Sequence, residues 1–88
     1  MEARVKELTE SGKYDEAIEL LTKEIAVSPQ NDGLLFSRGK IYWKKGDKKS
    51  AMNDYASAVK INPDSPAAIA LEQAHEVAQF FNPDLLNP

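Results

Sequence analysis

Residues that could carry out chemistry are few, because the 88-residue chain has one histidine and no cysteine. His75 lies between Glu72 and Gln79 on the polar side of an expected helix, and a metal site there would want a second strong ligand, such as a histidine four residues away. Glu72 and Glu76 are one helical turn apart, but nothing around them indicates the desolvation that acid–base catalysis uses. The sequence also lacks a Gly-rich phosphate loop. We therefore predict no enzyme activity, no cofactor and no metal site.

A second group of residues could recognise a ligand rather than transform it. Phe36 and Trp43 are seven residues apart, which places them two turns apart on one face of a helix, with Lys40 between them and Lys44 beside them. We call these four residues the aromatic–cationic strip. One interpretation is that it holds an amphipathic or acidic peptide, since Trp is favoured in interface hot spots. The alternative is that both aromatic rings pack against a later helix or the C-terminal tail.

Positive charge is concentrated in the middle of the chain. Residues 33–60 have a net charge of +5, residues 1–32 and 61–88 have −4 each, and the whole chain has −3. The cations that could form a polyanion site are Arg38, Lys40, Lys44, Lys45, Lys48 and Lys49. They are expected on two helices and a turn, so we predict a solvated turn or an acidic protein partner rather than nucleic acid.

Composition also predicts the cellular location of the protein. No segment approaches the roughly 20 apolar residues that span a bilayer, so we expect no membrane insertion. The absence of cysteine agrees with a reducing compartment, and we predict a cytoplasmic protein.

The elements that would position these residues repeat at an interval of 34 residues. At this offset the sequence aligns Gly12 with Gly46, Ala17 with Ala51, Pro29 with Pro63, Leu8 with Tyr42, Leu21 with Tyr55 and Ile25 with Val59. Each pair has its own structural role: the glycines permit a turn after a helix, the alanines permit close helix crossing, and the prolines end a unit. A constant offset of this length indicates a repeat architecture.

Periodicity predicts an all-α fold of five helices. Four are expected over residues 2–11, 14–27, 32–45 and 48–61, with Asp47 capping the fourth. A fifth begins at Ser65-Pro66 and extends to about Phe81. The remaining segment is too rich in proline to continue the helix, and we expect a tail docked through Leu85 and Leu86.

The second unit resembles the tetratricopeptide repeat. Its sequence contains Leu35-x-x-Arg38-Gly39-x-x-Tyr42, then Gly46-Asp47, Ala51-x-x-x-Tyr55, Ala58 and Pro63. The first unit departs from the family pattern at Met1, Arg4 and Val5. The resemblance implies one domain over residues 1–88, built as a right-handed α–α superhelix. It would comprise repeat 1 (residues 1–31), repeat 2 (residues 32–65) and a capping helix with its tail (residues 66–88).

The resemblance also implies a function. In this family the first helix of each pair lines a concave groove that binds a peptide or a helix of a partner protein. The groove would here be lined by Lys6, Thr9, Phe36, Lys40, Trp43, Lys44 and Ala74. Some members hold a chaperone's C-terminal carboxylate in a clamp of Lys, Asn and Arg, but Lys6 is the only cation at the corresponding positions.

Self-association remains an alternative to partner binding. About three repeats are usually needed for independent stability, so the capping helix or a second copy must supply additional burial. The acidic ends and basic middle of the chain would favour head-to-tail pairing, and a homodimer is therefore possible.

Overall fold

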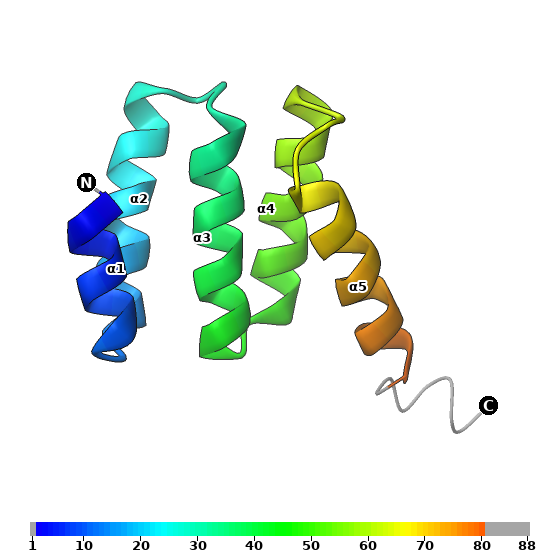
Figure 1. The fold of residues 1–88 in the computed structure, drawn as a ribbon, viewed down its shortest axis with the longest axis horizontal. Helices are drawn as coiled ribbons and strands as arrows, with labels where there is room; N and C mark the ends of the chain where they lie inside the picture. Colours follow the sequence, from blue (N-terminus) through cyan, green and yellow to red (C-terminus); the bar gives the residue numbers. More distant parts are fainter. Residues whose placement is uncertain (1, 81–88) are drawn as a thin grey trace.

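The computed structural model describes residues 2–80, and their side chains as far as Val77. This part of the chain forms five α-helices and no strand: α1 (Glu2–Glu10), α2 (Tyr14–Val27), α3 (Asp32–Lys45), α4 (Lys48–Ile61) and α5 (Ala67–Phe80). Figure 1 shows them following one another across the molecule in chain order, and the extensive helix contacts join consecutive helices. The predicted all-α helical-repeat fold is confirmed. The expected tail contacts of Leu85 and Leu86, and the expected helix end at Phe81, lie outside the described residues.

Two glycines form the turns within the helix pairs. Gly12 follows α1 with φ of 75°, and Gly46 follows α3 with φ of 100°. The Gly46 N–H donates to the carbonyls of Tyr42 and Trp43, which closes the last turn of α3. A residue with a Cβ would be strained at either φ, so both predicted turn glycines are confirmed.

Side chains cap three of the helices at their N-termini. The Asp47 carboxylate accepts a hydrogen bond from the Ser50 N–H (3.1 Å), as predicted, and hydrogen bonding by the Ser50 side chain and backbone lowers the pKa of Asp47. Asn31 accepts in the same way from Leu34 (3.3 Å), and the buried Ser65 hydroxyl accepts from Ala67 (3.1 Å). These bonds satisfy N–H groups that have no partner within the helix. At the start of α2, in contrast, Lys13 makes no side-chain cap.

Within the described residues the core consists of two clusters, each formed across a junction between consecutive units. Leu8, Ala17, Ile18 and Leu21 pack with Ile41 of α3, and Leu35, Ala51, Tyr55 and Ala58 pack with Ala67 of α5. Ala17 and Ala51 are completely buried, in agreement with their predicted place at helix crossings. Helix α5 therefore supplies apolar contact to the α3–α4 pair, as α3 does to the α1–α2 pair.

Helices α3 and α4 approach closely at Gly39. A Cβ atom at this position would lie 2.6 Å from Cε1 and 2.8 Å from Cδ1 of Tyr55, much closer than carbon atoms pack. The Tyr55 ring is buried and also packs on Phe36, with 5.9 Å between ring centroids. Because Gly39 has no side chain, the Tyr55 ring can lie close to α3, where it packs against the ring of Phe36.

Candidate functional site

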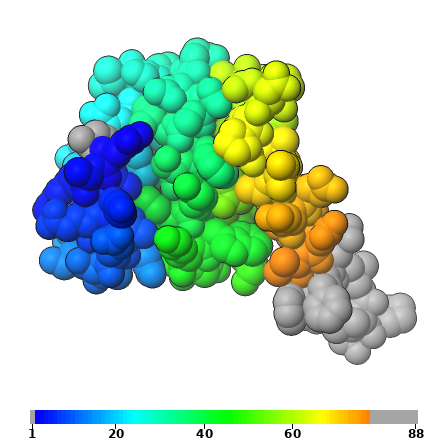
Figure 2. Space-filling model, viewed as in Figure 1, coloured from blue at the N-terminus to red at the C-terminus, as the bar shows by residue number. Residues whose placement is uncertain are grey.

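The candidate site is the face formed by α1, α3 and α5, which share the visible side of the molecule in Figure 2. A hollow of about 680 Å³ lies between α1 and α3, and we call it the polar hollow. Its charged and polar lining includes Glu2, Lys6, Thr9 and Glu10 from α1 and Ser37, Lys40 and Lys44 from α3. Apolar side chains line the rest of it, namely Val5, Leu21, Leu34, Phe36 and Ile41. Charged groups of both signs therefore surround this space.

A second hollow of about 490 Å³ lies on the other side of α3, and we call it the apolar hollow. Its lining comprises Phe36, Trp43, Tyr55, Pro66, Ile69, Ala70, Ala74 and Val77, with Lys40 and Gln73 as the polar members. The Tyr55 side chain in this wall is buried, and its burial raises the pKa of Tyr55. Ile69 is 63% exposed at the edge of the hollow, although large aliphatic side chains are usually buried.

All seven residues predicted to line one groove border a hollow, but they are divided between the two. Lys6, Thr9 and Lys44 border the polar hollow, Trp43 and Ala74 border the apolar one, and Phe36 and Lys40 border both. The division arises because α3 stands between α1 and α5.

Two of these seven residues offer less to a ligand than the sequence suggested. Ala74 is only 2% exposed, so it shapes the floor of the apolar hollow and presents little surface of its own. The Thr9 hydroxyl donates a hydrogen bond to the Val5 carbonyl (2.7 Å), so its proton is already used within α1.

The two aromatic residues of the strip are half-buried and lie under lysine side chains. The Lys40 ammonium lies 4.7 Å from the centroid of the Phe36 ring, and the Lys48 ammonium lies 5.4 Å from that of Trp43. Both rings also pack against the cluster that includes Ala67 of α5. Each ring is therefore partly core and partly wall of a hollow, and the interpretation that the strip holds a peptide stays a prediction.

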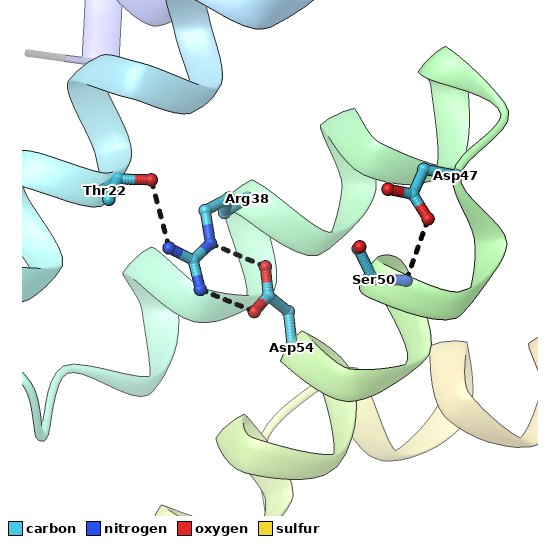
Figure 3. Close-up of polar contacts among 5 residues, drawn as sticks. All are labelled: Thr22, Arg38, Asp47, Ser50 and Asp54. Atoms are coloured by element: carbon cyan, nitrogen blue, oxygen red, sulfur yellow. Dashed lines mark hydrogen bonds and ion pairs between the residues drawn. The ribbon is translucent and has the colours of Figure 1, made fainter.

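The structure separates the six cations that the sequence grouped together. Arg38 donates two hydrogen bonds of 2.7 Å to the buried Asp54 carboxylate and one of 3.1 Å to the Thr22 hydroxyl (Figure 3). The bond to Asp54 raises the pKa of Arg38. Lys45 forms an ion pair with Asp15. Both cations are occupied within the fold, which weakens the case for a continuous polyanion surface.

Sequence reasoning missed two important residues. Asp54 lies within the apolar stripe of α4, where an acid signals a buried partner, but the sequence does not say that Arg38 supplies it. Ile69 is a large apolar residue of α5 that is 63% exposed, and the sequence interpretation assigned it no contact. His75 is exposed as expected, and residues 2–80 contain no cluster of three or more potential metal ligands.

None of the helices between residues 2 and 80 combines the length and the apolar character needed to cross a bilayer.

Two family models match the chain: one described as TPR repeat covers residues 6–46, and one described as Tetratricopeptide repeat covers residues 33–65. The chain is also similar to the solution NMR structure of the Bacteroides fragilis protein BF1650, with 34% sequence identity and a TM-score of 0.84. That similarity covers 97% of this chain and 87% of the other.

Proposed function

Because the chain belongs to the tetratricopeptide-repeat family, whose repeats generally mediate protein–protein interactions, we propose that its α1–α3–α5 face binds a peptide or helix of a partner protein. The observation that carries this proposal is the position of Phe36 and Lys40, which border both hollows. A segment lying across the face would contact these two residues whichever hollow it enters. The protein would then act as a non-catalytic adaptor or scaffold.

The chemistry of the strip favours an acidic or amphipathic partner. Lys40 and Lys44 are exposed, and neither forms an ion pair within the described residues. Half-buried rings of Phe36 and Trp43 lie beside them, so apolar and cationic contacts are available together. A reducing compartment such as the cytoplasm agrees with this proposal, since the chain contains no cysteine.

The proposal is tested by comparing partner recovery between charge-reversal variants of the full chain. Lys40→Glu and Lys44→Glu should each reduce recovery of the bound protein at least about tenfold, because a carboxylate would then face an acidic ligand. Lys60→Glu is the matched control, since Lys60 is exposed on α4 and lines neither hollow. Unchanged recovery with both strip variants would contradict binding on this face.

Self-association is a second candidate, favoured by the exposed Ile69 beside the apolar hollow. A second copy could cover this surface and so bury apolar area that two repeats and one capping helix leave in water. Light scattering over a range of protein and salt concentrations separates the candidates. A monomer at high micromolar concentration would exclude the homodimer.

A further inference from the structure

The two hollows differ in chemistry, and we infer that they receive different parts of one ligand. The ligand is an amphipathic segment of another protein whose apolar side chains enter the apolar hollow and whose carboxylates lie against Lys40 and Lys44. This inference rests on the proposed function and adds to it the composition of the partner segment and its placement across the face.

The apolar hollow selects for aliphatic or aromatic side chains. Rings of Phe36, Trp43 and Tyr55 form one wall, and Ile69 and Val77 contribute to the other. A ligand carboxylate placed deep in this hollow would lose its water and gain few polar partners, since most of the lining is hydrocarbon and Lys40 is its one charged member. Apolar ligand atoms would in turn cover the exposed face of Ile69.

The carboxylate position lies on α3 rather than on α1. Lys40 and Lys44 are on successive turns of α3, whereas Arg38 and Lys45 of the same helix are already paired with acids. On the facing wall, Glu2 and Glu10 flank the single cation Lys6. Two glutamates repel an approaching carboxylate from α1, so the attractive charge is concentrated on the α3 side.

These two preferences meet at Lys40, which borders both hollows. Acidic and apolar side chains of the ligand must therefore occur as adjacent blocks. A segment in which the two kinds alternate would place carboxylates in the apolar hollow or apolar groups over Lys44, and both arrangements lose favourable contact.

The test uses the full chain and two fluorescein-labelled peptides that have uncharged ends and identical leucine and glutamate content. In one peptide, which we call the blocked peptide, the leucines form one block and the glutamates form another. In the other peptide the two residue types alternate. Fluorescence anisotropy should give a Kd at least about tenfold lower for the blocked peptide, with a further loss of affinity for that peptide as salt is raised.

Paired substitutions in protein and peptide assign each block to its hollow. Ile69→Ser should weaken binding of the blocked peptide several-fold, and this loss should disappear when the peptide leucines are replaced by serine. Lys44→Gln should also weaken binding of the blocked peptide, and this loss should disappear when the peptide glutamates are replaced by glutamine. The matched controls are Val27→Ser, which changes an apolar residue 79% exposed on α2, and Lys60→Gln on α4. Neither control should change the Kd.

The inference would be overturned by equal affinity for the two peptides or by no binding of either. It would also be overturned if the loss caused by Ile69→Ser disappeared on replacement of the peptide glutamates instead of the leucines. The proposed function would survive any of these results if partner recovery still depended on Lys40. A doubled solution mass that Ile69→Ser abolishes would assign the apolar hollow to a second copy of the chain, and would also overturn the inference.

Discussion

At the crossing of α3 and α4 the facing residues are Gly39 and Tyr55, whereas the corresponding positions 34 residues earlier hold Val5 and Leu21. Leu21 is buried and Val5 packs against its cluster. One crossing therefore combines no side chain with a large ring, and the other combines two aliphatic residues of intermediate size. The comparison indicates that the two helix crossings are filled by different combinations of side-chain volume.

The polar contacts of the two pairs differ in the same sense. Arg38 reaches across to Asp54 on α4 and Thr22 on α2, but its counterpart Arg4 pairs, among the described residues, with Glu7 on its own helix. Both side chains of that second pair are well exposed, at 59% and 69%. A largely buried ion pair thus joins α3 to α4 in addition to their apolar contacts, whereas the contacts described between α1 and α2 are mainly apolar.

The largest expected effect is at the α3–α4 crossing. Gly39→Val should reduce the free energy of unfolding by about 3 kcal/mol, because its Cβ would overlap the buried Tyr55 ring and force the helices apart. This loss exceeds the gain of up to about 1 kcal/mol from replacing glycine within a helix. Urea denaturation followed by circular dichroism measures the change.

The double variant Gly39→Val/Tyr55→Leu decides whether volume is the cause. It reproduces the Val5–Leu21 pair at the second crossing, so it should recover more than half of the lost stability. Additive losses from the two single substitutions would show that the crossings are not interchangeable.

The next largest effect is expected at Asp54. Asp54→Ala should cost about 2 kcal/mol, less than a fully buried pair would, because the Arg38 side chain remains 18% exposed and partly hydrated. Thermal unfolding should show a melting temperature lower by about 10 °C. Arg4→Ala is the matched control and should leave the melting temperature unchanged, as expected for an exposed pair. A similar loss in both variants would contradict the distinction between the two pairs.

A smaller effect, of opposite sign, is expected at the start of α2. Lys13 has φ of −90° and ψ of 64°, close to the −89° and 79° of Asp47, but it provides no cap. Lys13→Asp should therefore accept a hydrogen bond from the Glu16 N–H and stabilise the protein by about 0.5–1 kcal/mol. Lys13→Ala controls for loss of the lysine alone. Equal stability of the two variants would show that the backbone similarity does not suffice.

The smallest effect is a pH dependence at Asp47. Its hydrogen bond from Ser50 lowers its pKa below 3.8 in the folded protein, so the ionised form stabilises the fold at neutral pH. This contribution is lost as the pH falls through the folded pKa. Asp47→Asn retains a cap that cannot titrate, so the difference in urea midpoint between the two proteins should shrink between pH 7 and pH values well below 3.8. A constant difference would contradict the assignment.

The helices and turns were predictable because their signals are local. Gly12 and Gly46 adopt the positive φ that glycine favours, and Asp47 caps the helix that follows it. The start of α5 has a local signal too: the Ser65 hydroxyl accepts a hydrogen bond from the Ala67 N–H, as expected of a serine that precedes a proline at a helix N-terminus. Such interactions span a few residues and leave a clear mark on the sequence.

The site was less predictable because it depends on how the helices are rotated and spaced. The strip on α3 followed from helical periodicity, but its role as a divider between two hollows required the position of α5. The exposure of Ile69 required the rotation of that helix about its axis. The pairing of Arg38 with Asp54 joins residues 16 positions apart on different helices, and no local pattern records that contact.

The restriction of extensive packing to consecutive helices has a consequence for folding kinetics. Every such contact joins neighbouring segments of the chain, so little loop-closure entropy opposes it and the contact order is low. Structure can form at one helix pair and spread to the next, and folding is expected on the microsecond-to-millisecond timescale. Because the core of the described residues joins helices that are consecutive or separated by one helix, an additional 34-residue unit could lengthen the array without rearranging those already present.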